Sequence, residues 1–309
     1  MAESETQSNN QSQQSKSGLV QIAVTTLLIL ALLGVVVLLY VQGLRVGAEF
    51  HYNQAVRAVS GNRTDLEQAQ LSGEKAVSLV GFDDRYHRAL SQIYLLRINQ
   101  VVGDDSNPER QQREFRNLVN RAMREAQAAV QVADHDMNNW VNQGSVYETL
   151  MNYAVQGAPQ AAINSYKKAV ELAPTNPALR VRLGRVHLAK AIMESRGEEV
   201  NVEQDLQQAG KHLKKALSLR PNYANARYFL GLVYDERGDK QKAIGQFEQI
   251  AAINERNKEQ VDPILENLEA DRPALGERAQ PEEIEGMPME EATSTNATTT
   301  ATTTVPQQE

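Results

Sequence analysis

One spacing of small residues recurs along the chain and limits what it can fold into. Alanine pairs with six residues between them occur four times, and each pair lies shortly before a residue that favours a helix end. Residues seven apart lie on one face of an α-helix, so each pair marks a place where a second helix can approach closely. A single unit of this kind cannot bury its own apolar face and needs copies stacked on it. The sequence therefore predicts an all-α fold of repeated helix pairs. The four pairs are Ala69 and Ala76, Ala122 and Ala129, Ala162 and Ala169, and Ala209 and Ala216.

The pattern around these alanines resembles the tetratricopeptide repeat, a helix–turn–helix unit of about 34 residues. Two positions in the last copy, residues 224–257, depart from the family: Ile250 replaces a small residue and Glu255 replaces the closing proline. Two weaker copies precede residue 140, around Leu90 and around Gly73. The matching residues of the three best copies are Trp140, Gly144, Tyr147, Ala162, Tyr166, Ala169 and Pro174; Leu183, Gly184, His187, Ala209, Leu213, Ala216 and Pro221; and Leu230, Gly231, Tyr234, Gly238, Asp239, Ala243 and Phe247.

The resemblance implies a right-handed α-solenoid of about five helix pairs, which we place at residues 46–269. Glycine and alanine would lie where helices cross closely, and the aromatic residues would fill the space between successive pairs. The alternative is an unrelated alanine-rich helical bundle, in which some of this spacing arises by chance.

The copies differ in length between their two helices. The spacing from the Tyr or His position to the next alanine is nine residues in the last copy and 15, 22 and 28 in the others, hence insertions of six, 13 and 19 residues. Insertions in a solenoid collect on one face, often a binding face. We expect lengthened helices or loops at residues 99–113 and 191–205.

An apolar segment near the N-terminus predicts a transmembrane helix. Residues 22–41 are interrupted in polarity only by Thr25 and Thr26, and twenty helical residues span about 30 Å, the thickness of a hydrocarbon core. The alternative is a cleaved signal peptide, but the apolar run is long and only Lys16 supplies positive charge ahead of it. We assign the membrane helix to residues 19–43.

The orientation of this helix is weakly specified. Arg45, Arg57 and Arg63 follow the helix and favour a cytoplasmic repeat domain by the positive-inside rule. Long domains translocate largely regardless of charge, however, and the threonine-rich C-terminus is typical of an exported segment. We expect a single-pass protein with its repeats on the outer, extracytoplasmic side.

The two ends differ from the body in composition. Residues 1–18 are rich in Gln, Ser and Asn, and residues 270–309 contain eight acidic and two basic residues, a net charge of −6 out of −7 for the chain. Both ends are predicted to be disordered because they have little apolar surface to bury. A nearly neutral body with an acidic tail is a poor nucleic-acid binder.

No sequence feature predicts catalysis, cofactor binding or metal binding. The chain has no cysteine, its five histidines lack metal-ligand spacing, and phosphate-binding or nucleophile motifs are missing. His187 occupies an interhelix position that is tyrosine in the family, so packing is its expected role. We predict no catalytic residue, no cofactor and no metal.

Binding is the expected activity, because the first helix of each pair lines a concave groove in tetratricopeptide arrays. Some members of the family hold a peptide carboxylate with a fixed set of Lys and Asn residues, which this sequence does not reproduce. The polar candidates could bond an extended protein or peptide, or simply form a polar wall. They are Arg85, Arg88, Asn138, Asn142, Arg182, Arg185 and Asn225, and Asp235 shares their register in the last copy.

The sequence thus predicts a non-enzymatic, membrane-tethered scaffold for protein–protein interaction at a bacterial cell envelope. Two alternatives remain: an accessory component of a surface-glycan assembly system resembling O-antigen ligases or polymerases, and a chaperone or adaptor.

Overall fold

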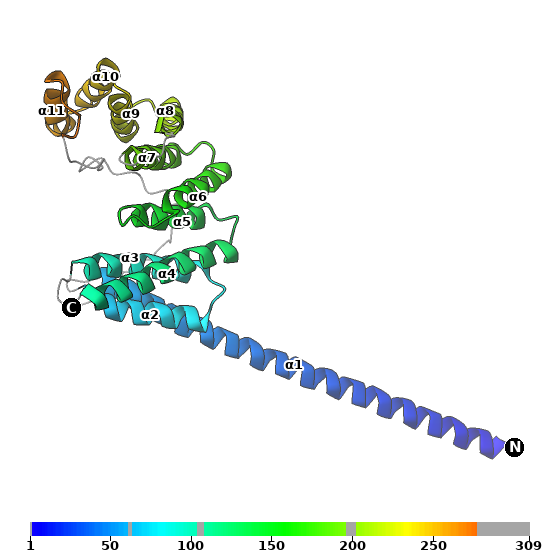
Figure 1. Cartoon of the computed structure of the whole chain (residues 1–309). Helices are drawn as coiled ribbons and strands as arrows, with labels where there is room; N and C mark the ends of the chain where they lie inside the picture. The colour runs from blue at the N-terminus through cyan, green and yellow to red at the C-terminus, as the bar shows by residue number, and fades with distance from the viewer. Residues whose placement is uncertain (1, 61–63, 104–107, 196–201, 277–309) are drawn as a thin grey trace, which may run out of the picture. The chain divides into compact units, whose positions relative to one another are not determined.

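The computed structural model describes residues 2–60, 64–103, 108–195 and 202–276, with side chains from residue 24 onward. These residues form eleven α-helices, and the described part of the chain contains no β-strand (Figure 1). The prediction of an all-α fold is confirmed. The helices are α1 (Ala2–Ser60), α2 (Leu66–Leu79), α3 (Asp84–Val102), α4 (Pro108–Val132), α5 (Met137–Met151), α6 (Ala158–Leu172), α7 (Pro177–Glu194), α8 (Val202–Leu219), α9 (Ala224–Glu236), α10 (Lys240–Ala251) and α11 (Glu255–Glu269).

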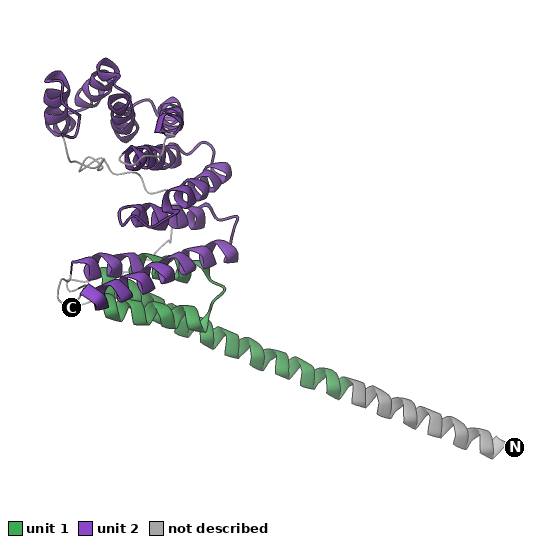
Figure 2. Ribbon diagram, viewed as in Figure 1, with its two compact units in different colours: residues 1–93 green, residues 94–309 purple. Residues whose placement is uncertain are grey.

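The chain divides into two compact units, residues 1–93 and 94–309, so that the division falls within α3 (Figure 2). In the first unit, the C-terminal part of α1 packs on α2 through small residues. Ala48 and Ala76 are fully buried together, and a Cβ on Gly47 would lie 3.4 Å from Leu79. Small side chains therefore bring α1 and α2 together, as the repeat pattern predicts.

Helix α1 continues well beyond both limits predicted for the membrane helix. It begins at Ala2 instead of residue 19 and continues through Gly43 to Ser60. No proline interrupts this stretch, so no residue type forces the helix to end at either predicted boundary. The apolar segment and the first helix of the repeats are consequently one continuous element.

In the second unit, successive helices form packed pairs: α5 with α6, α7 with α8 and α9 with α10, each pair contacting the next (Figure 1). Three glycines lie where the helices of a pair cross. A Cβ on Gly144 would lie 2.7 Å from Tyr166, one on Gly184 2.7 Å from Leu213, and one on Gly231 2.8 Å from Phe247. Only glycine fits these crossings, which accounts for its recurrence one position after Leu183 and Leu230.

Short polar side chains start the helices at the predicted breaks. Asp136 accepts a hydrogen bond from the Asn138 amide at 2.8 Å, and Asn176 accepts one from the Ala178 amide at 2.9 Å ahead of a proline in the first turn of α7. These caps satisfy amides that have no partner within the helix.

Two of the insertions lengthen helices, and the third forms a loop. Helix α4 has 25 residues, and α7 and α8 have 18 each, against 13 and 12 for α9 and α10. The shortest insertion forms the turn between α5 and α6, where Ala154 and Gly157 adopt positive φ angles of 52° and 78°. Residues 104–107 and 196–201 of the longer insertions lie outside the described residues.

The C-terminal end of the second unit is covered by α11 and the segment that follows it. Val261 and Leu268 of α11 join the core formed with α9 and α10. The next segment turns back, and the Ala274 amide donates a hydrogen bond to Asp235 Oδ2 of α9 at 2.8 Å. Residues 277–309 of the predicted disordered tail lie outside the described residues, and the predicted limits of the repeat domain stay a prediction.

Candidate functional site

The polar candidates of the second unit all lie on the first helices of their pairs. Asn138 and Asn142 belong to α5, Arg182 and Arg185 to α7, and Asn225 to α9. Counted from the crossing glycines Gly144, Gly184 and Gly231, Asn138 and Asn225 share one register position, Asn142 and Arg182 share another, and Arg185 lies at a third.

Arg185 takes part in a half-buried polar link between two helix pairs. Its Nε donates to Glu148 Oε1 of α5 at 2.7 Å, and Tyr166 of α6 donates its hydroxyl to Glu148 Oε2, also at 2.7 Å. The side chains of Arg185 and Glu148 are 19% and 16% exposed, so solvent screens this ion pair only weakly. The guanidinium also lies 5.8 Å from the ring centroid of Phe229 in α9. Arg185 therefore connects three successive pairs.

The electrostatics of this link keep Tyr166 protonated. Burial raises the pKa of the Tyr166 hydroxyl, and the negative charge of Glu148 raises it further, although Arg182 and Arg185 oppose that effect. A neutral hydroxyl is a hydrogen-bond donor, which is what the carboxylate of Glu148 requires.

The remaining candidates of the second unit differ in accessibility. Asn142 and Asn225 are buried, at 8% and 1% exposed. Asn138 and Arg182 are half-buried and open to solvent in part. Of the five, Asn138 and Arg182 are thus the residues best placed to reach a bound segment.

The first unit holds the other two candidates in local ion pairs. Arg85 contacts Asp83 at 2.8 Å and Glu49 of α1 at 3.3 Å, and Arg88 contacts Asp84 at 2.6 Å. Tyr86 donates to Glu49 at 2.9 Å; burial and this carboxylate raise the pKa of Tyr86 to about 12. Arg85 therefore ties the start of α3 to α1.

The sequence interpretation missed Glu148, although it joins two of the predicted helices. The sequence feature that points to this role is its position about one helical turn after Gly144, on the side of α5 that contacts α7. An acidic residue there is not distinguishable by pattern from the many solvated carboxylates on these helices.

Comparison with known families identifies the repeats. Two family models described as tetratricopeptide repeat match the chain, at residues 138–176 and 203–268. The first match contains most of α5 and all of α6, and the second contains all of α9 and α10 with most of α8 and α11. The chain is a tetratricopeptide repeat protein.

Solved structures of other repeat proteins are similar at low sequence identity. The MamA protein is 15% identical over 69% of this chain and 94% of its own, with a TM-score of 0.49. YrrB, described as a tetratricopeptide repeat protein with an unusual peptide-binding site, is 17% identical over 66% and 84%, with a TM-score of 0.44. TTC0263 of Thermus thermophilus is 18% identical over 66% and 90%, with a TM-score of 0.44. At this level of similarity nothing about function passes from them to this chain, and no curated protein matches it.

As a tetratricopeptide repeat protein, the chain is a protein–protein interaction scaffold. Proteins of this family are generally non-catalytic. Among the described residues, no group of three or more His, Asp or Glu side chains is arranged to hold a metal ion. The predicted lack of a cofactor, metal or catalytic residue stays a prediction.

Proposed function

We propose that this tetratricopeptide repeat protein is a non-enzymatic scaffold tethered to the membrane of the cell envelope by α1. In this proposal the repeats stand on the outer side and hold an extended segment of a partner protein against the first helices α5, α7 and α9. Asn138 and Arg182 would bond the partner, while Glu148 and Arg185 hold the pairs in register.

The continuity of α1 carries this proposal. One described helix is long and apolar enough to cross a membrane, with a mean hydropathy of 2.8 in its most apolar window, and none of that window is buried. Large side chains such as Leu27 and Leu39 are 70% and 67% exposed along it. In water, an exposed apolar surface of this extent would promote association between molecules. In a membrane, the hydrocarbon layer would cover it.

The packing of α1 also bears on the signal-peptide alternative, which the same apolar segment satisfies. Cleavage near Gly43 would cut within a helix whose next turns carry Gly47 and Ala48 against α2. An intact helix keeps these contacts continuous with the apolar segment and therefore favours an anchor.

Extraction of membranes with alkaline carbonate tests the anchor. The double variant Leu30→Arg, Leu33→Arg places two charges in the apolar segment, so we expect the protein to move from the membrane pellet to the soluble fraction. Leu71→Arg, on an exposed apolar side chain of α2, is the matched control and should stay in the pellet. A double variant that remains in the pellet, or a wild-type mass that shows loss of the N-terminal segment, would contradict the anchor.

Site-specific photocrosslinking tests the partner surface. A benzophenone side chain at Asn138 should capture a protein partner in intact cells, and Arg182→Glu should weaken that capture. The same probe at Lys215, exposed on the second helix α8, is the control position. Crosslinks from residue 215 but not from residue 138 would place the partner on the other side of the helix pairs.

A further inference from the structure

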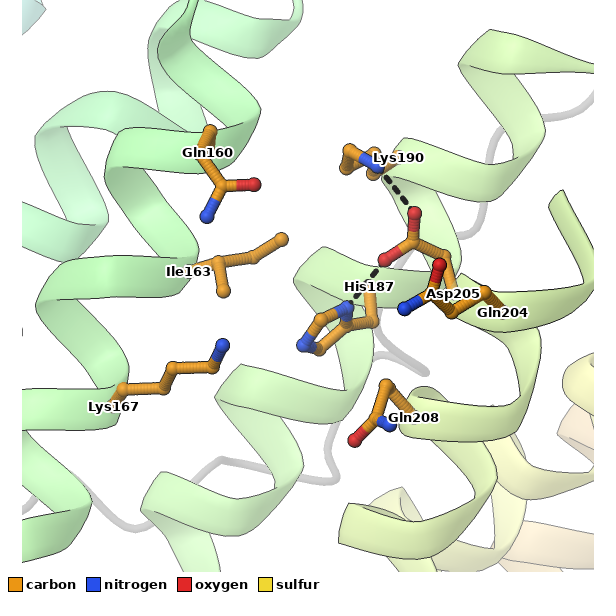
Figure 3. A pocket seen from close by; sticks show the side chains of 8 residues that line it. All are labelled: Gln160, Ile163, Lys167, His187, Lys190, Gln204, Asp205 and Gln208. Carbon is orange, nitrogen blue, oxygen red and sulfur yellow. Dashed lines mark hydrogen bonds and ion pairs between the residues drawn. The ribbon is translucent and has the colours of Figure 1, made fainter. Parts of the chain in front are cut away.

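A polar cavity lies between α6, α7 and α8 of the second unit, away from the groove candidates. Its volume is about 390 Å³, within the range of roughly 300–1,000 Å³ that is usual for small-molecule sites. Figure 3 shows α6 forming one wall and α8 the other, with His187 of α7 between them. The side chains that concern us are Gln160 and Lys167 of α6, His187 and Lys190 of α7, and Gln204 and Gln208 of α8.

The ring of His187 is held in one orientation by an acidic partner. Its Nδ1 lies 2.6 Å from Asp205 Oδ1, and the other oxygen of Asp205 pairs with Lys190 (Figure 3). A carboxylate that is paired with a lysine accepts hydrogen bonds only, so His187 Nδ1 carries the proton and donates it. Burial lowers the pKa of His187 below its ordinary value, even though Asp205 acts in the opposite direction. The ring is therefore neutral at pH 7.

This arrangement leaves a buried acceptor directed at the cavity. With the proton on Nδ1, the Nε2 atom has a lone pair, and no described residue donates a hydrogen bond to it. The side chain of His187 is 6% exposed, and its free ring nitrogen points toward the wall that α6 forms (Figure 3). Buried polar atoms of this kind are nearly always hydrogen-bonded. Nε2 therefore calls for an N–H or O–H donor from a molecule in the cavity.

The other polar groups that line the cavity require the reverse. The ammonium group of Lys167 only donates, and the amides of Gln204 and Gln208 both donate and accept. A carboxylate would suit Lys167 but could not donate to His187. An amine could donate to His187, but Lys167 and Lys190 would repel its charge. A hydroxyl group satisfies both walls, because it donates one hydrogen bond and accepts others.

We propose that the cavity between α6, α7 and α8 binds a small neutral polyol, such as one sugar unit, with one hydroxyl donating to His187 Nε2 and accepting from Lys167. The site differs from the peptide surface of the first helices and does not depend on it. Gln204 and Asp205 belong to the 13-residue insertion of this copy, so the insertion supplies chemistry that the repeat motif lacks. The repeat provides the helix pair, and the insertion provides the polar wall.

Ligand-observed and ¹⁵N-histidine NMR test this site on the full chain in lipid nanodiscs, because sugar-based detergents would compete. We expect D-glucose or myo-inositol to bind saturably and to shift the His187 Nε2 resonance. Acetate, which can only accept hydrogen bonds, and methylammonium at equal concentration should leave it unchanged. Acetate binding at this resonance, or no saturable response to any polyol in a panel of neutral sugars, would overturn the proposal.

Variants separate the cavity from general packing. His187→Phe keeps an aromatic ring but removes Nε2, and Lys167→Met removes the exposed donor on α6; each should weaken polyol binding at least tenfold. His212→Phe is the matched control, because His212 stacks on His187 at 5.9 Å without lining the cavity. Thermal midpoints identify any variant that fails to fold, and Lys167→Met, at an exposed position, keeps the test valid in that case. Equal loss of binding in folded His187→Phe and His212→Phe would contradict a role for Nε2.

Discussion

At the scale of single residues, the crossing glycines set the distance between the helices of a pair. Gly184 is the tightest case on the backbone side, since an added Cβ would lie 2.7 Å from Leu213 Cγ and 3.2 Å from the Ala209 carbonyl oxygen. This carbonyl is part of the α8 backbone and cannot rotate away as a flexible side chain can. The crossing has no spare room for even one methyl group.

We therefore expect Gly184→Ala to lower the free energy of unfolding by about 1–3 kcal/mol, as overpacking does in other cores. Gly245→Ala is the matched control in α10, where a Cβ would meet nothing within 4 Å. Alanine favours a helix over glycine, so this control should be stabilised by about 0.5–1 kcal/mol. Urea unfolding followed by the fluorescence of Trp140, the only tryptophan, measures both changes, and equal effects of the two variants would contradict the crossing argument.

The glycines and alanines at the crossings could be predicted from the sequence, because their spacing alone indicates where two helices approach closely. The partners of His187 and Arg185 could not. A packing role was predicted for His187, and the structure does bury it, but the contact with Asp205 depends on how the insertion extends α7 and α8. Which polar side chains meet across two helices depends on helix length and rotation, which a repeat pattern does not encode.

The stacked histidines make the stability of the protein depend on pH. Burial lowers the pKa of His212 to about 4, with the charges of His187 and Arg180 acting in the same direction. An unfolded histidine titrates near 6.5, so the unfolded chain binds more protons between about pH 6.5 and 4. The contribution of the neutral, stacked histidine rings to the free energy of unfolding is therefore fully present above pH 6.5 and is lost as the pH falls toward 4.

The urea midpoint should accordingly decrease between pH 7.5 and pH 5, and His212→Phe should flatten that decrease by removing one of the titrating rings. His135→Phe serves as the control, since the side chain of His135 is 85% exposed and stacks on nothing in the described residues. An unchanged slope in His212→Phe would show that the pH dependence arises elsewhere.

At the scale of elements, neighbouring pairs are joined by specific polar contacts as well as by apolar packing. The link from Glu148 to Arg185 connects α5 with α7, and Tyr166 adds α6 to it. The sequence predicted the helix pairs, and it predicted lengthened helices or loops at residues 99–113 and 191–205, because both follow from spacing. The link needed the structure, since Arg185 had been assigned to the partner surface on register alone.

A double-mutant cycle of Glu148→Ala and Arg185→Ala should give a coupling energy of about 1–3 kcal/mol, because both groups are largely removed from solvent. The pair Glu109 and Arg113 is the control: it lies within one helix, its side chains are 87% and 66% exposed, and its coupling should be below about 0.5 kcal/mol. Urea unfolding of the wild type and the six variants measures both cycles. Similar couplings would mean that the Glu148 link adds no special stability.

At the scale of the whole molecule, the C-terminal end depends on its cover. Val261 is fully buried and Leu268 nearly so against the core of α9 and α10. Repeat arrays need an end unit with a polar outer face, because the last apolar surface has no further copy to meet. Helix α11 provides that unit.

A chain ending after Ile253 should lose about 2–5 kcal/mol of stability, from the burial of a few large apolar side chains, and should self-associate through the exposed face. A chain ending after Gly276 keeps the cover and is the matched control. Size-exclusion chromatography with light scattering distinguishes them, and a monomeric shorter chain of unchanged stability would show that α11 is dispensable.

The hydrogen bond from Ala274 to Asp235 has a consequence for any ligand that lies along the first helices. Asp235 occupies the position in α9 where the register expects a polar group to face the ligand, but a backbone amide from the chain itself already uses that carboxylate. A residue of the chain itself therefore already occupies this contact at the C-terminal end of α9. In the proposed binding mode, a segment that reaches α9 must therefore displace residue 274 before it can bond Asp235, so the segment after α11 competes with the partner for this position.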